Sequence, residues 1–467
     1  MNTQTATTTF DAALLARYDR PGPRYTSYPP ATAFTPQFGP ADYADAVQHS
    51  NSDPIPRPLS LYVHVPFCLS PCFYCGCMRV VSRDPARSES YVSYLQREAG
   101  LTAPLFDRDR EVLQLHFGGG TPNLLSAAQL ERLLRCLREQ FNLADGSRLE
   151  AGMELDPRSA DADYVHTLAG LGFNRVSLGV QDFDPSVQQA VNRLQSLEQT
   201  RNVVEAARAV GMHSVSIDLI YGLPLQTVEG FSETLRQVIA LAPDRIAVYG
   251  YAHMPERFRA QRRIRSEDLP DGQTRNALLG RAVEALGEAG YLYIGLDHFA
   301  RRSDALVAAQ QQGQLQRNFQ GYSTHAACDL IGLGVSAISH IGTSYSQNER
   351  ELAGYCAALD AGRLPLARGL NLSPDDVIRG DAIQQIMCHA RLDTAAFGAR
   401  HRIDFDTTFA ATLAQLAPLA AQDLVRLQPG LITVTPTGRF LLRVIARCFD
   451  NHDGALDTVL PLVRAAR

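Results

Sequence analysis

The chain has 467 residues, of which 45% are hydrophobic and 20% are charged, as in ordinary globular proteins. This length is sufficient for one large enzyme domain with appendages. The formal net charge of −5 argues against nucleic acid as the main partner, and no apolar run approaches the roughly 20 residues that a membrane helix needs.

The N-terminus lacks a basic segment followed by an apolar one, so we predict no signal peptide. Nine cysteines, four clustered and five scattered, do not form the pattern of a secreted disulfide framework. We therefore expect a protein of the reducing cytoplasm. Lysine is absent, so lysine-based phosphate or Schiff-base chemistry is excluded, and arginine must bind any anionic ligand.

Residues 1–50 are predicted to form an extended arm. The stretch 21–30, PGPRYTSYPP, contains four prolines and a glycine, which disfavour both a helix and a central strand. Tyr25 and Tyr28 argue against a disordered tail, which would be poor in aromatic residues. Arg24 is a candidate for binding a carboxylate; the alternative is a solvated surface arginine.

Four cysteines, Cys68, Cys72, Cys75 and Cys77, follow a short apolar strand predicted at 61–65. The first three have the spacing C-x3-C-x2-C, which can direct three thiolates from one loop to one place. A [4Fe–4S] cluster takes one thiolate per iron, so three cysteines would leave one iron open to a small molecule. A structural zinc site takes four ligands. A disulfide pair, a zinc knuckle and unrelated buried thiols remain alternatives.

Short apolar segments and amphipathic helices alternate after the cysteines. Helices are predicted at 126–141, where Ser126 and Gln129 form a capping box, and at 197–210, which ends before Gly211. The repeated β–α order predicts a parallel sheet. About six units indicate a partial (β/α)6 barrel, whose site would lie at the carboxyl ends of the strands. The other predicted strands are 112–117, 149–155, 174–180, 213–220, 245–251 and 291–297.

Polar or glycine-rich residues follow these strands and are expected to share one rim. Consecutive glycines at 118–120 let the backbone approach a ligand closely and present N–H groups to it. A tight turn is the alternative explanation for the glycines, and helix caps for the other residues. The other rim candidates are Thr121, Glu154, Asp156, Gln181, Asp182, Arg193, Asp218, Tyr251 and His253.

Three later segments complete the prediction. The glycine-rich stretch 318–342 is expected to be a buried loop over a pocket, and the arginine run at 257–265 to be a solvated helix face. From 365 the periodicity is mostly helical, through 374–392 and 407–421. We predict three parts: the arm at 1–50, a barrel at 51–364, and a mainly helical, winged-helix-like domain at 365–467 that acts as a lid. A basic excess typical of a DNA reader is lacking.

The order of several motifs resembles one family closely. PGPRYTSYP, YVHVPFCLSPCFYCGC, LHFGGGTP, ELDPR, GVQDF, VNR, IDLIYGLP, YAHMP, DHFA, RNFQGY and GVSAIS run in the order seen in oxygen-independent coproporphyrinogen III oxidases (dehydrogenases), members of the radical S-adenosylmethionine (SAM) superfamily. The resemblance covers nearly the whole chain. It implies that two propionates of coproporphyrinogen III are converted to vinyl groups, giving protoporphyrinogen IX in haem biosynthesis.

The resemblance also implies the cofactors and their residues. Cys68, Cys72 and Cys75 would ligate a [4Fe–4S] cluster, and a 5′-deoxyadenosyl radical from SAM would abstract hydrogen. Tyr62, Gly119, Glu154 and Ile338 would contact this SAM, and His64 and Cys77, with Tyr62, match positions linked to activity. A second SAM, described for the family, would be lined by Tyr74, Gly120, Thr121, Gln181, Arg193, Asp218 and Ala252.

The implied partners are coproporphyrinogen III and a one-electron donor such as flavodoxin, and we expect a monomer. Two rival interpretations are kept. A haem-binding, chaperone-like relative in the superfamily typically lacks the Gly76-Cys77 continuation and the PGPRYTSYP arm, both of which are present here. A zinc-dependent DNA-binding protein is disfavoured by the missing fourth paired ligand and by the acidic charge.

Overall fold

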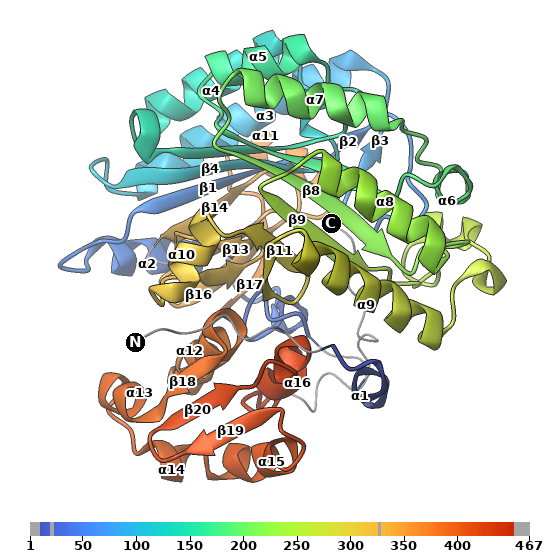
Figure 1. The fold of residues 1–467 in the computed structure, drawn as a ribbon. Coiled ribbons are helices and arrows are strands. Elements are labelled where there is room, and N and C mark those ends of the chain that lie inside the picture. Colours follow the sequence, from blue (N-terminus) through green and yellow to red (C-terminus); the bar gives the residue numbers. More distant parts are fainter. Residues whose placement is uncertain (1–9, 19–22, 326–327, 453–467) are drawn as a thin grey trace.

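Six short apolar segments form neighbouring parallel strands in the computed structural model (Figure 1). They are β1 (Leu59–Val65), β4 (Glu111–Gly119), β6 (Glu150–Leu155), β7 (Arg175–Gln181), β8 (Ser214–Tyr221) and β9 (Arg245–Gly250). The helices that connect them are α3 (Pro85–Thr102), α4 (Ala127–Gln140), α5 (Ala162–Gly170), α6 (Pro185–Ala190), α7 (Leu197–Ala209) and α8 (Val228–Ala240). This confirms the predicted parallel β/α barrel.

The structure describes residues 10–18, 23–325 and 328–452. Predictions for 1–9, 19–22 and 453–467, which include Pro21 and Gly22 of the arm motif and the end of the last domain, lie outside these ranges. In the described part of the chain, no helix is long and apolar enough to cross a membrane.

The barrel remains open because both edges of the sheet continue into other strands. Beyond β9 lie the antiparallel strands β11 (His298–Arg301) and β10 (Tyr291–Gly295). Beyond β1 lies β14 (Asp329–Leu333), which is parallel to it, followed by antiparallel β15 (Ile338–Ile341), β16 (Ser344–Asn348) and β17 (Leu366–Asn371). With β5 (Asn142–Leu143) at the start of β4, the sheet has 13 strands.

The prediction of a loop at 318–342 is therefore wrong over much of that segment. The five residues of β14 are all buried because the strand lies between β1 and β15 inside the sheet. A strand buried on both sides has no polar alternation to reveal it in the sequence. Before it, β12 (Gln316–Asn318) and β13 (Gly321–Ser323) form a hairpin.

Alternation along the barrel strands separates the core from the barrel interior. In β1 the side chains of Leu61 and Val63 belong to the main hydrophobic core, which includes Leu133 and Leu137 of α4. The alternate residues of the strands, such as Ser60 in β1 and Ser216 in β8, point to the opposite face, which is the inside of the barrel. The barrel interior is consequently polar, and this is where the site lies.

Residues 23–50 are only partly extended. Residues 23–39 cross the molecule mostly as irregular backbone, and Thr35 forms a β-bridge with Gly369 of β17. The N-terminal region also contains α1 (Ala12–Arg17) and α2 (Pro40–Asn51), which the prediction of an extended arm missed. The α2 helix begins at Pro40 because proline suits a first helical turn, and Asp42 accepts a hydrogen bond from the Gly39 N–H at 2.8 Å.

The C-terminal part forms a second hydrophobic core, at the bottom of Figure 1. Its helices are α12 (Pro374–His389), α13 (Thr394–His401), α14 (Phe405–Thr408), α15 (Ala410–Ala420) and α16 (Leu442–Arg447). Its three antiparallel strands are β18 (Arg391–Asp393), β19 (Val425–Gln428) and β20 (Leu431–Val434). Of the other helices, α9 (Gly272–Glu288) and α11 (Leu352–Asp360) pack into the main core, and α10 (Ala305–Gln311) packs into the second core.

Candidate active site

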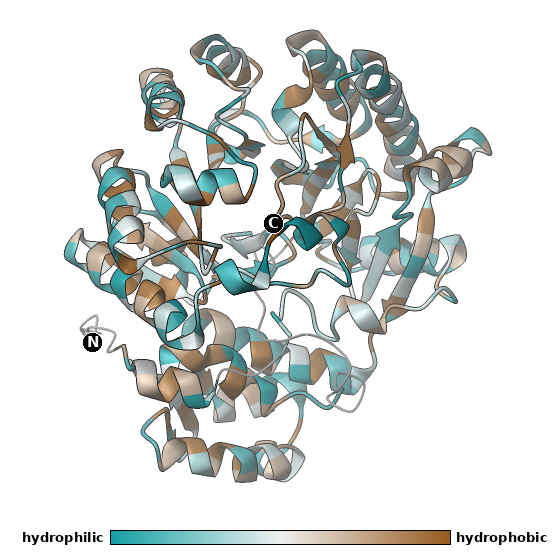
Figure 2. Cartoon of the chain, turned by 90° about the vertical axis from the view of Figure 1, so that its right-hand side faces the viewer, coloured by the Kyte–Doolittle hydropathy of each residue, from teal (hydrophilic) through white to brown (hydrophobic). Residues whose placement is uncertain are grey.

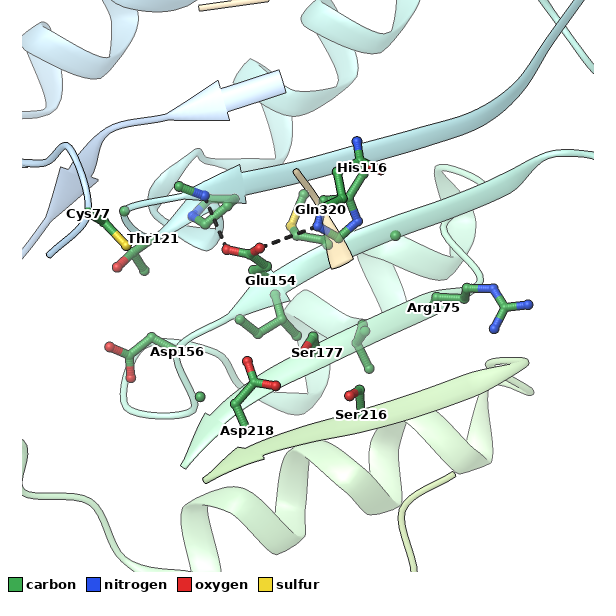
Figure 3. A pocket seen from close by; sticks show the side chains of 18 of the residues that line it. Cys77, His116, Thr121, Glu154, Asp156, Arg175, Ser177, Ser216, Asp218 and Gln320 are labelled. Atoms are coloured by element: carbon green, nitrogen blue, oxygen red, sulfur yellow. Dashed lines mark hydrogen bonds and ion pairs between the residues drawn. The ribbon is translucent and has the colours of Figure 1, made fainter. Parts of the chain in front are cut away.

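A cavity of about 340 Å³ lies inside the barrel, and the loop with the four cysteines forms one of its walls. In Figure 3, Cys77 and Thr121 lie at one end, Arg175 lies at the other, and Glu154, Ser177 and Asp218 lie between them. The cavity is lined by most of the predicted site residues: Cys68, Cys72, Tyr74, Cys75, Cys77, Gly119, Gly120, Thr121, Glu154, Gln181, Arg193 and Asp218.

A strand pairing between its two ends and contacts with two other parts of the barrel fix the cysteine loop. The short strand β2 (Phe67–Cys68) pairs with β3 (Val80–Val81), so the loop leaves and returns at the same place. The Phe73 N–H donates to the Val191 carbonyl at 2.9 Å, and the Gln261 side-chain amide donates to the Tyr74 carbonyl at 2.8 Å. The positions of the thiols are thus determined by the β7–α7 and β9–α9 connections.

Each of the three predicted ligand thiols accepts hydrogen bonds from nearby groups. The Thr121 hydroxyl donates to Cys68 Sγ at 3.5 Å, and the Cys77 N–H donates to Cys75 Sγ at 3.4 Å. Burial raises the pKa of Cys68 to about 11, whereas a hydrogen bond from the Cys77 side chain lowers the pKa of Cys75 to about 6. These donors would stabilise the thiolate form that a metal ligand requires.

Two arginine side chains lie next to the thiol of Cys72, the remaining predicted ligand. Arg193 Nη1 lies 3.5 Å from Cys72 Sγ, and Arg158 Nη2 lies 3.7 Å from it. Both arginines also pair with Asp156, at 3.3 Å and 2.6 Å respectively. Although burial opposes the charge, Arg193 and Arg158 lower the pKa of Asp156 to about 2. Arg158 was missed in the sequence, where its signal was its place two residues after Asp156 in ELDPR.

The three thiols fit a [4Fe–4S] cluster. They line one cavity from one loop, no described cysteine is in a disulfide, and the cluster takes one thiolate per iron. Cys68, Cys72 and Cys75 would therefore hold it. Next to them, the cavity presents the Glu154 carboxylate, which can bind the amino group of an amino acid.

The glycine turn after β4 requires glycine on steric grounds. Gly119 has φ +120°, and an added Cβ would lie 2.7 Å from the His64 ring. A Cβ on Gly120 would lie 2.6 Å from the Pro66 carbonyl oxygen. The Gly119 N–H donates to Glu154 Oε2 at 3.1 Å, which joins the turn to β6 (Figure 3). The glycines thus permit close packing of the turn on β1 and the cysteine loop.

Tyr62 and His64 lie together on the inward face of β1. His64 Nε2 is 3.2 Å from the Met78 carbonyl, which can only accept, so Nε2 carries the hydrogen and Nδ1 accepts from the Tyr62 hydroxyl at 3.2 Å. Burial lowers the pKa of His64, which favours this neutral ring. His64 therefore fixes the exit of the cysteine loop at Met78.

The remaining predicted residues have different positions. Ala252 is buried just after β9. Ile338 is the first residue of β15 and lies close to Gly332 of β14, because a Cβ on Gly332 would be only 2.5 Å from the Ile338 carbonyl oxygen. Gly332 pairs with Tyr62. Ala252, Ile338, Tyr62 and His64 are thus near the site but are not among the residues that line the cavity.

Arg24 also lies outside the lining of the cavity. Its guanidinium pairs with Asp297 at 3.2 Å and lies 5.6 Å from the centroid of the Tyr249 ring, which does line it. Tyr25 and Tyr28 are buried in the second core and donate hydrogen bonds to Asp450 at 3.0 Å and Asn451 at 2.6 Å. In this structure the arm therefore connects the barrel to the C-terminal domain.

A second group of charged residues, missed in the sequence, lies at the other end of the cavity. Arg175 Nε is 2.9 Å from Glu150, and Arg245 Nε is 2.9 Å from Asp304. Gln320, of the RNFQGY motif, also lines the cavity. The signal for this group was the alternation of polar and apolar residues inside β6, β7 and β8. At this end of the cavity, the charge of the two arginines is thus balanced by neighbouring carboxylates.

Comparison with known proteins identifies the class. Residues 62–238 match the radical SAM superfamily, and residues 372–441 match the HemN C-terminal domain. The site and this match define a radical SAM protein.

Its relatives narrow the assignment. The chain is 49% identical to the oxygen-independent coproporphyrinogen III oxidase of Pseudomonas aeruginosa, over 95% of this chain and 96% of the relative. It is 45% identical to that of Escherichia coli, over 95% of each chain. The structure of coproporphyrinogen III oxidase (HemN) from E. coli superposes with a TM-score of 0.90, at 44% identity, covering 96% of this chain and all of that one. The chain belongs to the oxygen-independent coproporphyrinogen III oxidase family, which confirms the resemblance.

Proposed function

We propose that the protein is a radical SAM oxidoreductase that decarboxylates two propionates of coproporphyrinogen III oxidatively to vinyl groups, giving protoporphyrinogen IX for haem biosynthesis. The observation that carries the proposal is the set of three thiols facing one polar cavity in a chain of this family. When bound, a [4Fe–4S] cluster and SAM would supply the one-electron chemistry that removes a hydrogen from a propionate carbon.

The chain's own residues would hold the reactants and keep water out. Cys68, Cys72 and Cys75 are the proposed cluster ligands. Tyr62, Gly119, Glu154 and Ile338 are the proposed contacts of the SAM at the cluster. Support for this comes from the Gly119–Glu154 hydrogen bond, which places an N–H group and a carboxylate beside the cysteine loop. We assign no general acid or base, because the proposed chemistry does not need one.

A second SAM molecule is part of the proposal. Its site would consist of Tyr74, Gly120, Thr121, Gln181, Arg193, Asp218 and Ala252. All of these except Ala252 line the cavity, and Ala252 is buried immediately after β9. The side chains of Gln181 and Arg193 lie close together, because each has an atom within 3.2 Å of the position that a Cβ on Gly179 would occupy. His64 and Cys77 are proposed to support turnover from beside the cluster ligands.

The substrate carries four propionates, which arginines must neutralise in a chain without lysine. Arg24 remains our proposed contact, because its guanidinium lies over Tyr249 at the edge of the cavity. The proposed partner is a one-electron donor such as flavodoxin, and we propose a monomer in the cytoplasm.

Anaerobic reconstitution tests the function. Protein loaded with iron and sulfide should cleave SAM with a chemical reductant, and with coproporphyrinogen III it should release protoporphyrinogen IX. Exposure to air should bleach the cluster and stop both reactions, because an iron without a protein ligand is open to oxygen. SAM cleavage without protoporphyrinogen would contradict the substrate assignment. Haem binding without SAM cleavage would favour the chaperone-like alternative.

A further inference from the structure

The arginine run at 257–265 lies against the cysteine loop. Residues Arg259–Arg263 form a 3₁₀ turn in the connection from β9 to α9. From this turn, buried Gln261 binds the Tyr74 carbonyl, and the Phe258 ring lies 3.0 Å from where a Cβ on Gly76 would be. The Arg263 guanidinium lies 5.5 Å from the centroid of the Phe73 ring. The run therefore covers the outer side of the loop that holds the proposed cluster ligands.

The run concentrates positive charge in an acidic protein. All five arginines at 257, 259, 262, 263 and 265 are exposed. Only Arg265 forms an ion pair with a carboxylate among the described residues, with Glu267 at 2.8 Å and Asp268 at 3.6 Å. The other four leave their charge to solvent on a chain whose net charge is −5. A solvated helix face, as predicted from the sequence, does not explain why this charge is placed over the cysteine loop.

Exposed apolar side chains surround the same loop. Among the described residues six large apolar side chains are exposed, and four of them are here: Leu69 (46%), Val81 (46%), Leu194 (65%) and Leu225 (47%). Leu69 follows Cys68, which pairs with Val81, and Leu194 follows Arg193. The Leu225 N–H donates to the Asp268 carbonyl at 2.8 Å beside the arginine run.

The two kinds of exposed residue occupy one side of the molecule. In Figure 1, β2, β3, α6 and the connection between β9 and α9 lie on the right, and Figure 2 views that side directly. Figure 2 shows strongly hydrophilic short turns next to apolar segments there. An apolar patch with a charged rim is typical of a protein–protein interface.

We infer that this surface docks a small acidic protein that carries one electron, and that the arginine run steers it to the cluster. The inference rests on the proposed function, because it needs a cluster held by Cys68, Cys72 and Cys75. In the transfer, the carrier is oxidised by one electron and the cluster is reduced by one, and no atoms are exchanged. Electron-transfer encounters use small interfaces, and complementary charge accelerates their association. The carrier must be acidic because the exposed rim is basic.

Charge reversal tests the surface. The probe is an acidic flavodoxin, and its dissociation constant for the cluster-loaded protein is measured anaerobically at low and high salt. The variant is Arg259→Glu/Arg262→Glu, since neither side chain is paired with a carboxylate in the described structure. The matched control is Arg108→Glu/Arg135→Glu, which makes the same charge change at exposed residues before β4 and on α4. Arg259→Gln/Arg262→Gln gives a milder second variant.

The expected result is binding that weakens roughly tenfold or more in the Glu variant, and less in the Gln variant, while the control stays within about twofold. High salt should weaken binding of the unchanged protein and reduce the difference between variants. Reduction of the cluster by prereduced flavodoxin, followed by its absorbance, should slow in parallel, whereas reduction by dithionite should not change.

Equal effects of the variant and the control, or binding of unchanged protein that is insensitive to salt, would overturn the docking surface. Failure of the proposed function has a different signature. In that case the unchanged protein would hold no cluster or would fail to cleave SAM even with dithionite.

Discussion

Arg24 and Asp297, which are 273 residues apart in the chain, form an ion pair of 3.2 Å in which the Asp297 side chain is only 1% exposed. Asp297 follows β10 at one edge of the sheet, and Arg24 comes from the arm, whose Tyr25 and Tyr28 are anchored in the C-terminal domain. The pair thus ties three parts of the molecule together next to Tyr249, a residue of the cavity wall.

Arg24→Ala should weaken coproporphyrinogen binding and lower the protoporphyrinogen formed per 5′-deoxyadenosine released. It should also lower the free energy of unfolding by about 1–3 kcal/mol, because a buried carboxylate loses a charged partner. Arg17→Ala, at an exposed residue of α1, is the control and should change neither quantity. If Arg24→Ala changes stability alone, with KM and product ratio intact, the arm is structural and the propionates are held elsewhere.

Cys68→Ala, Cys72→Ala and Cys75→Ala should each purify without a stable cluster, because each removes one of the three proposed ligand thiols from the cavity. Cys77→Ala should retain the cluster, since the Cys77 N–H that donates to Cys75 belongs to the backbone and remains. It should impair turnover, since the hydrogen bond from the Cys77 side chain to Cys75 is lost. Iron and sulfide content, with the visible absorbance of anaerobic protein, measures this. Iron-free Cys77→Ala protein together with a fully loaded variant at one of the other three positions would contradict the ligand assignment.

Gly120→Ala should destabilise the protein by about 1–3 kcal/mol, since the new methyl group would overlap the Pro66 carbonyl and push the cysteine loop away from β4. Reduced cluster loading should accompany the loss. Gly100→Ala, in α3 with nothing within 4 Å of its Cβ position, should instead stabilise by about 0.5–1 kcal/mol. The measurements are denaturant unfolding and iron content of both variants. Equal free energies of unfolding for the two variants would show that the turn can relax around the new methyl group.

Glu98 should make stability depend on pH. Burial raises its pKa to about 7, although Tyr355, Gly334 and Asn348 donate hydrogen bonds to it at 2.6, 2.7 and 2.6 Å. The unfolded chain loses this proton near pH 4.3. Between these pH values the folded state binds more protons, so the free energy of unfolding should fall as pH rises, by about 4 kcal/mol in all.

Glu98→Gln removes this titration. The difference in unfolding free energy between the unchanged protein and Glu98→Gln, measured from pH 5.5 to 8, should therefore fall with pH and level off above pH 7. A difference that stays constant over this range would show that Glu98 is ionised in the folded protein throughout.

The barrel was predictable because its signals are local. The apolar stretch at 61–65 and the capping box of Ser126 and Gln129 determine a strand and a helix without reference to the rest of the chain. The cysteine spacing was local as well. By contrast, β14 has no local signal, since each of its five residues is buried on both sides of a sheet.

Contacts between distant residues were also beyond prediction. Nothing near Arg24 in the sequence points to Asp297, and nothing near Arg158 points to Cys72. The arginine run was correctly predicted to be exposed, yet its position over Phe73 and Tyr74 depends on how the β9–α9 connection folds back. The sequence shows the composition of such a segment, but the residues that it contacts are determined by the topology of the fold.

The pairing of β1 with β14 sets an order for biosynthesis. Leu59 pairs with Asp329, about 270 residues further along the chain, so the strand that leads into the cysteine loop keeps one bare edge until late in translation. The cysteines leave the ribosome long before the sheet that positions them can be completed. The iron–sulfur assembly machinery should therefore act only after β14 has emerged, and chains truncated before residue 329 should fail to acquire iron even though they contain every cysteine of the loop.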